Sequence, residues 1–240
     1  MQVKGFDLSV TPLTSEEVVD HIVDATSQKR GLTISNVNLH GLYMFETDPQ
    51  FANFTKSADL CLVDGWPVLK LVEGRPLPSR YRVGSTDWLE VLLGQGGFTI
   101  AAIGGTPESS ARTAEVFNRE FDVTWLPQHG YDLEKRSSEV DAAIREADIV
   151  LVGLGMPRQE RWILKNSDKL SGKVVANVGG CFDYYSGAQR LAPRWMGAMG
   201  LEWLYRLSCD PRRLARRYLV EPFRLARLVR RRNASRRRHA

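Results

Sequence analysis

The residue best suited to chemistry is Asp64, which directly follows the apolar run Leu60-Cys61-Leu62-Val63 and precedes Gly65. A carboxylate at the mouth of a buried strand can act as a general base and deprotonate an alcohol for attack on a second substrate. Asp-Gly is also ordinary turn chemistry, so a purely structural role for Asp64 stays open.

Glycines and a few polar residues follow most of the other apolar runs. These ends are Asn36 and Asn38, Gly104-Gly105-Thr106, Gly153-Leu154-Gly155, and Gly179-Gly180 with Asp183. Glycine turns allow close backbone approach and offer amide donors at helix N-termini, which suits a bound diphosphate. Glycine also ends strands in proteins without a ligand there, so a ligand site and a structural role stay equally open on these grounds.

Several familiar sites are excluded by their motifs. The segment Gly153–Trp162 lacks the third glycine of a dinucleotide fingerprint, and the chain has no GxxxxGK[ST] phosphate loop. It has no GxSxG elbow, and its four His show no metal-ligand spacing. Within Gly153–Trp162, Gln159 falls in the first turn of a predicted helix. Its amide could therefore contact a ligand, or it could simply be exposed.

The elements that must position these residues alternate between strand and helix, which predicts an α/β fold: a Rossmann-like, mostly parallel sheet with helices on both faces. The predicted strands are Leu32–Asn38, Leu60–Asp64, Phe98–Gly104, Val123–Leu126, Asp148–Gly153 and Lys173–Val178. The predicted helices are Ser15–Ser27, Gly41–Ser57, Trp88–Leu93, Glu108–Glu120, Glu134–Ala147, Arg158–Lys169, Pro193–Ser208 and Pro211–Arg232. Ligands of such sheets bind beyond the carboxyl ends of the strands.

Composition places the chain among ordinary globular proteins, with 43% hydrophobic and 25% charged residues. The apolar runs are too short to span a bilayer, and the start lacks the pattern of a signal peptide. The three Cys form no CxxC pair, which indicates reduced thiols. We therefore expect a cytoplasmic protein. The strand–helix alternation and the loss of acidic residues near residue 190 set the bounds of the α/β domain, expected to be the catalytic one, at residues 1–190.

Charge is distributed unevenly along the chain. Residues 190–240 contain fifteen Arg and no Lys, against only Glu202, Asp210 and Glu221, while the net charge of the whole chain is +5. Guanidinium groups bind phosphate oxygens in pairs, so this pattern predicts an anionic partner. We expect a helical appendage over residues 191–232 and a disordered tail over 233–240. A solvated helix face is the plainer interpretation.

Four stretches in order carry a resemblance to the WecG/TagA/CpsF family, glycosyltransferase family 26. They are Ala58–Gly65, His129-Gly-Tyr131, Val152–Trp162 and Val178–Asp183, followed by Gly187, Arg190–Pro193, Gly200–Arg206, Pro211 and Arg213. The resemblance covers about residues 30–220. It implies an inverting, UDP-sugar-dependent hexosyltransferase, metal-independent in the best-understood members. Such enzymes transfer a sugar to a polyprenyl-diphosphate-linked saccharide at the inner face of the bacterial membrane.

The resemblance also implies roles for individual residues. Asp64 matches the general base, and Gln159 and Asn38 match polar residues that line the same pocket. Donor binding is expected from Asn36, Gly105, Tyr131, Gly155 and Asp183. Diphosphate binding of the acceptor is expected from Arg206, Arg213 and Arg216. No metal or other cofactor is expected, because we see no DxD-type pair beside the pocket. Many members have Thr where this chain has Asn36, so the donor sugar stays open.

Three interpretations remain. UDP-N-acetylmannosamine is the first choice of donor, and UDP-glucose or UDP-glucuronate in exopolysaccharide synthesis is the alternative. Expected partners are the UDP-sugar, the polyprenyl-diphosphate acceptor and an anionic membrane surface, with peripheral attachment at the inner face. A nucleic-acid-binding protein would also explain the Arg-rich segment, but no such module is recognisable, so no nucleic acid is expected. Homo-oligomerisation is left open.

Overall fold

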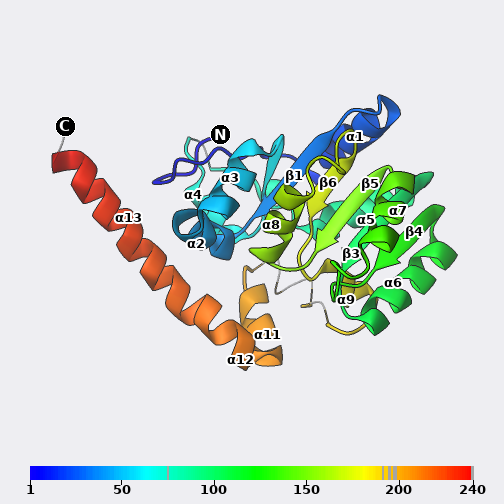
Figure 1. Cartoon of the computed structure of the whole chain (residues 1–240). Coiled ribbons are helices and arrows are strands. Elements are labelled where there is room, and N and C mark those ends of the chain that lie inside the picture. The colour runs from blue at the N-terminus through cyan, green and yellow to red at the C-terminus, as the bar shows by residue number, and fades with distance from the viewer. Residues whose placement is uncertain (75, 191, 194–195, 197–198, 239–240) are drawn as a thin grey trace.

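The computed structural model describes residues 1–74, 76–190, 192–193, 196 and 199–238, with the side chains of Arg213 and residues 232–238 outside the description. Its centre is one six-stranded sheet of strand order β2-β1-β6-β5-β3-β4, in which every pairing is parallel (Figure 1). The strands are β1 Leu32–Val37, β2 Leu60–Val63, β3 Phe98–Gly104, β4 Val123–Gln128, β5 Ile149–Gly153 and β6 Val174–Asn177. The α/β prediction and all six strands are confirmed.

Helices cover both faces of this sheet. In the body they are α1 Ser15–Ser27, α2 Leu39–Thr47, α3 Pro49–Ser57, α4 Trp66–Leu71, η1 Ser79–Tyr81, α5 Ser85–Gln95, α6 Pro107–Glu120, α7 Ser137–Glu146, α8 Arg158–Lys165 and α9 Cys181–Tyr185. After the body come α11 Glu202–Cys209, α12 Pro211–Ala215, the π-helical turn η2 Arg216–Val220 and α13 Glu221–Arg238.

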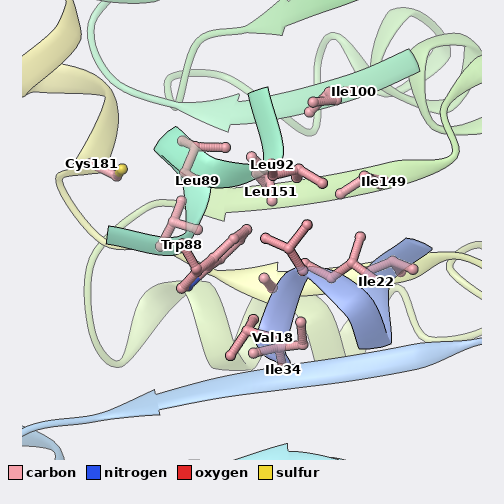
Figure 2. Close-up of a cluster of buried hydrophobic side chains, with 14 of the residues drawn as sticks. Val18, Ile22, Ile34, Trp88, Leu89, Leu92, Ile100, Ile149, Leu151 and Cys181 are labelled. Carbon is pink, nitrogen blue, oxygen red and sulfur yellow. The ribbon is translucent and has the colours of Figure 1, made fainter. Parts of the chain in front are cut away.

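The core lies on the two sides of the sheet because alternate strand residues point to opposite faces. On one side, α1, α5, α6 and α9 pack on Ile34, Ile100 and Leu151 of the strands. Figure 2 shows Trp88 and Leu92 of α5 meeting this layer. On the other side, α3, α7 and α8 pack on strand residues such as Val150. The chain leaves β1 for α2 and leaves β6 for α9, which belong to opposite clusters, so a crevice opens between these neighbouring strands.

Several details of the helices differ from the sequence prediction. The single helix expected over Gly41–Ser57 is two helices, because Asp48 ends α2 and its carboxylate accepts hydrogen bonds from the backbone N–H groups of Gln50 and Phe51 at the start of α3. Pro49 at the first position of α3 suits this break. The short helices α4, η1 and α9 were not predicted. Of the helix expected over Pro193–Ser208, the structure describes α11 from Glu202 onward, and residues 194, 195, 197 and 198 lie outside the described residues.

The C-terminal helices form the expected appendage, which we define as α11, α12, η2 and α13. Its inner side is held to the body: Leu214 and Leu225 are buried, and Leu225 packs with Leu42 and Phe45 of α2. The His40 ring on α2 lies 2.5 Å from the Glu221 carboxylate. Figure 1 shows α13 running past α2 and away from the sheet. The helix continues to Arg238, where disorder was predicted, because Arg and Ala are strong helix formers.

Candidate active site

A cleft of about 1440 Å³ opens at the carboxyl ends of β1, β2, β5 and β6 and is bordered by the appendage. The strand ends and the segments that follow them contribute Asn36, Asn38, Asp64, Gly155, Gln159, Asn177 and Gly179 to its lining. Arg82, Gly84 and Asp87 line it beside α5. The appendage contributes Glu202, Arg206, Leu214, Arg217 and Tyr218. Asn36, Asn38, Asp64, Gly155, Gln159, Asp183 and Arg206, all predicted from sequence, thus lie around one space.

Asp64 is held by the end of the neighbouring strand. Its backbone N–H donates to the Val37 carbonyl at 2.9 Å, which continues the β1–β2 pairing by one residue. Its Oδ2 accepts a hydrogen bond from Asn38 Nδ2 at 3.1 Å. Gly65, at φ +93, turns the chain into α4 immediately afterwards. The carboxylate is partly exposed and points into the cleft with one oxygen oriented by an amide.

Asn38 connects this carboxylate to the appendage. It is the N-cap of α2, and its Oδ1 accepts from Gly41 N at 3.1 Å. The same oxygen accepts from the Arg217 guanidinium at 3.3 Å. Because the amide oxygen is fixed by two donors, its Nδ2 must face Asp64. The orientation of the acidic group therefore depends on a residue of the appendage.

A second carboxyl group lies close to Asp64. A Cβ added at Gly84 would lie 3.4 Å from both Asp64 Oδ1 and Asp87 Oδ2, so the bare glycine leaves space between the two acids. Asp87 Oδ2 accepts from Gly84 N at 2.8 Å. Burial raises the pKa of Asp87, the Gly84 hydrogen bond opposes this, and the charges of Asp64 and Glu202 add to the rise. Two acids in unequal environments are suited to different protonation states.

Two arginines of the appendage face the cleft, Arg206 and Arg217. Arg206 pairs with Glu202 one turn earlier and lies over the Tyr184 ring, 5.5 Å from its centroid. Burial acts to lower the pKa of Arg206, but Tyr184 and Glu202 outweigh it and raise the pKa. Burial lowers the pKa of Arg217, and the charge of Arg206 adds to this. Arg217 Nε is buried and has no hydrogen-bond partner among the described residues.

The other two predicted arginines are placed differently. The Arg213 side chain lies outside the described residues, and only its backbone in α12 is given. Arg216 is exposed and does not line the cleft. The predicted spacing assumed one straight helix, but the appendage breaks at Asp210 and contains the π-helical turn, which changes the direction of its side chains. Arg217, which sequence reasoning missed, occupies the cleft instead.

Gln159 holds two backbone turns together in the wall of the cleft and thereby braces them. It is 1% exposed, and its Oε1 accepts from the backbone N–H groups of Gly155 and Gly179, each at 3.1 Å. Its Nε2 donates to Glu160 at 2.7 Å. Both ends of the amide are thus engaged within the protein, whereas the sequence left ligand contact and surface exposure as the alternatives. The fold brings Gly155 and Gly179 together from the ends of adjacent strands, which local sequence does not reveal.

Asn36 is buried on β1, and its side chain forms hydrogen bonds to the neighbouring strand β6. Its Nδ2 donates to the Asn177 carbonyl at 2.7 Å, which leaves Asn36 Oδ1 without a partner among the described residues. Asp183 also lines the cleft, but its oxygens accept from Ser109 Oγ at 3.0 Å and Gln189 Nε2 at 3.2 Å. It therefore ties α9 to α6 in this structure.

Two predicted donor-binding residues belong to the loops that follow β3 and β4. Tyr131 is 59% exposed in the loop after β4, the outermost strand of the sheet. Gly105 follows β3, and its carbonyl accepts from Gly130 N at 2.9 Å. Neither lines the cleft. Their assigned roles stay predictions. A Cβ added at Gly130 would lie 2.9 Å from the Leu154 side chain and 3.5 Å from Gly104, so the loop after β4 folds back over the ends of β3 and β5.

The cleft combines one oriented carboxylate, a second acid, two guanidinium groups and glycine turns with open backbone. This set can remove a proton from a hydroxyl while holding an anionic group nearby. Among the described side chains, no group of three His, Cys, Asp or Glu residues is arranged to hold a metal ion. Within the described ranges, no helix is long and apolar enough to cross a membrane.

A comparison with protein families gives a match over nearly the whole chain. The family model described as Glycosyl transferase WecG/TagA/CpsF family matches residues 3–239. That range includes both the α/β body and the appendage, so the cleft is formed entirely from matched residues. The family is one of glycosyltransferases of cell-surface polysaccharide synthesis, and its activity suggests a nucleotide-sugar donor and a lipid-linked acceptor. The chain belongs to the WecG/TagA/CpsF family of glycosyltransferases.

Proposed function

We propose that the protein is an inverting hexosyltransferase that moves a sugar from a UDP-sugar to a polyprenyl-diphosphate-linked saccharide. The observation that carries the proposal is the Asp64–Asn38–Arg217 chain of hydrogen bonds, which joins a carboxylate and an appendage guanidinium at one cleft. A transfer between two diphosphate-bearing substrates needs one base and positive charge at the diphosphates. The cleft offers both.

In this mechanism Asp64 removes the proton of the acceptor hydroxyl as its oxygen attacks the anomeric carbon of the donor. The new C–O bond forms on the face opposite the departing UDP, so the configuration inverts. The bond from the anomeric carbon to the β-phosphate oxygen breaks, and UDP leaves with the electron pair. Asn38 keeps one Asp64 oxygen engaged and leaves Oδ1 on the side of Gly84. Arg206 and Arg217 supply charge for a diphosphate.

We infer a peripheral position on the inner face of the cell membrane from the outer side of the appendage. Leu219, Val220 and Phe223 are exposed, Phe223 at 77%, and Arg224, Arg227 and Arg230 lie around them. Apolar side chains surrounded by arginine suit a helix lying at an anionic lipid surface. Each basic residue near such a surface contributes about 1 kcal/mol to binding. The polyprenyl chain of the acceptor lies in the same surface.

The donor is tested by product analysis. The purified protein is incubated with UDP-N-acetylmannosamine, UDP-glucose or UDP-glucuronate and a polyprenyl-diphosphate saccharide, and products are read by mass. We expect transfer from UDP-N-acetylmannosamine, with activity retained in EDTA. Asn36 Oδ1, buried and unpartnered among the described residues, can accept a hydrogen bond from a donor hydroxyl or amide. Product only from UDP-glucose or UDP-glucuronate would establish the exopolysaccharide alternative, and no product from any of the three would refute the proposal.

Adjacent arginines give a matched pair of variants for the appendage. Arg217→Gln removes a guanidinium from the cleft, and we expect kcat/KM on a short-chain soluble acceptor to fall about 100-fold. Arg216→Gln removes an exposed charge one residue away, and we expect kcat/KM to stay within about twofold. Steady-state kinetics of both variants check this. Equal losses would show that the appendage contributes only overall charge.

A further inference from the structure

Behind the floor of the cleft lies a buried acid that the proposed mechanism does not use. Glu160, on α8, is 0% exposed and lies outside the lining of the cleft. Its Oε1 accepts from Gln159 Nε2 at 2.7 Å and from Asn177 Nδ2 at 2.6 Å. Its Oε2 is buried and has no hydrogen-bond partner among the described residues. A buried carboxyl group with one uncompensated oxygen costs stability, so a role beyond packing is expected.

The two amides that Glu160 orients control the backbone of the cleft floor. Gln159 Oε1 holds the backbone N–H groups of Gly155 and Gly179. Asn177 Oδ1 accepts from Asn36 N at 2.8 Å, which ties β6 to β1. Because the Glu160 carboxylate accepts from Asn177 Nδ2 and from Gln159 Nε2, each of these amides must present its oxygen to the backbone. One carboxyl oxygen thereby sets the direction of both side chains.

The two glycine turns are open toward a ligand. Gly155 has φ +75 and Gly179 has φ +57, and a Cβ added at either residue would meet nothing within 4 Å. Gly153, two residues before Gly155, is crowded, because a Cβ there would lie 2.7 Å from the Gly179 carbonyl oxygen. The turns are therefore packed tightly against each other while their outer surfaces are bare backbone. Such surfaces allow close approach of a nucleotide.

We propose that Glu160 is a positioning residue for donor binding: it orients Gln159 and Asn177 so that the Gly155 and Gly179 turns form the surface on which the UDP moiety lies. The inference rests on the proposed function, since it takes UDP as the bound group. Burial raises the pKa of Glu160, against the opposing hydrogen bonds from Gln159 and Asn177, and the charge of Asp48 adds to the rise. A raised pKa favours the protonated acid, whose shape an amide reproduces.

The test compares two substitutions at this position. Glu160→Gln keeps an acceptor oxygen for both amides, and we expect its Kd for UDP to stay within about threefold of the wild-type value. In Glu160→Leu the new side chain has a similar volume but no acceptor oxygen, so the buried donors Gln159 Nε2 and Asn177 Nδ2 lose their hydrogen-bond partner. We expect its Kd for UDP and its KM for the donor to rise about tenfold to a hundredfold. The KM for the acceptor should stay within about twofold.

Titration calorimetry with UDP and steady-state kinetics give these values, and thermal unfolding reports stability. Asp48→Asn is the control, because Asp48 is buried and bonded to Arg161 away from the cleft, so it should lower the Tm and leave the Kd for UDP unchanged. If Glu160→Leu does not fold, Glu160→Met takes its place, because it also lacks an acceptor oxygen and its flexible side chain fills the same space, and the same rise in Kd for UDP is expected.

The outcomes separate this inference from the proposed function. Wild-type affinity for UDP in Glu160→Leu would overturn the role of Glu160 while leaving the proposed donor intact. Equal weakening in Glu160→Gln and Glu160→Leu would overturn it as well, because the acceptor oxygen would then be irrelevant. A comparable rise in the Kd for UDP in Asp48→Asn would show that lost stability alone weakens binding, and it would also overturn the proposed role of Glu160. Failure of the wild-type protein to bind UDP would refute both proposals.

Discussion

Replacing Asp64 by Asn is expected to lower kcat by about 10²–10⁴-fold, the usual contribution of a positioned general base. The substitution keeps the size of the side chain and removes its ability to accept a proton. Asn38 Nδ2 donates to one Asp64 oxygen at 3.1 Å, and the carbonyl oxygen of the introduced amide can take the same place, so the cleft should keep its shape. We expect the Kd for UDP to stay within about twofold.

The matched control is Asp59→Asn, at the other end of the same strand. Asp59 directly precedes β2, and its Oδ2 accepts from Thr33 N at 2.7 Å, far from the carboxyl ends of the strands. This variant tests loss of an aspartate from the strand without loss of the base, and its kcat should be unchanged within about twofold. Near-normal turnover of Asp64→Asn in single-turnover assays would remove Asp64 from the mechanism.

Removing residues 193–240 is expected to abolish transfer on any acceptor, including a short-chain soluble one. The deletion takes away Arg206 and Arg217, and it takes away the partner that holds the Asn38 oxygen. The sheet and the cluster between α1, α5 and the strands contain no appendage residue, so the body should remain folded and bind UDP. Product assays, circular dichroism and UDP titration check the three parts of this prediction.

A variant of the exposed side separates membrane attachment from the cleft. The double substitution Leu219→Ser with Phe223→Ser changes two exposed apolar side chains of the appendage, and neither lines the cleft. We expect it to bind anionic liposomes at least about tenfold more weakly and to keep wild-type activity on a soluble acceptor. Full activity of the 193–240 deletion on that acceptor would mean that the appendage only tethers the enzyme.

The strands were predictable because their cause is local. Most are short apolar runs ended by glycine or a polar residue, such as Ile149–Gly153, and burial on both faces of the central strands selects this composition. The convergence of Asn38 and Asp64 followed from the parallel arrangement of their strands. The break at Asp48-Pro49, which the single helix predicted over Gly41–Ser57 overlooked, also has a local cause, because Asp is a strong N-cap and Pro favours the first helical position.

The missed parts of the site depend on distant contacts. Gln159 braces Gly179, which lies on another strand, so no local pattern distinguishes that role from exposure. Arg217 faces the cleft because the chain turns after α11 and passes through a π-helical turn, and helical spacing alone favours Arg216. The resemblance assigned Tyr131 to donor binding, and its side chain is exposed in the loop after β4 and does not line the cleft, so that role stays a prediction.

The π-helical turn Arg216–Val220 also sets the spacing between the cleft and the exposed apolar side of the appendage. It joins Arg217, which faces the cleft, to Phe223, which faces outward, within six residues of one helical path. At the α-helical rise of 1.5 Å per residue, this spacing is roughly 9 Å along the helix axis, so in a helix that lies along the surface the two residues stay close to one place on the membrane. On the proposed function, an acceptor diphosphate could meet Arg217 without lifting its lipid chain from the membrane. Inserting one residue between these positions would rotate the two surfaces by about 100° relative to each other and uncouple them.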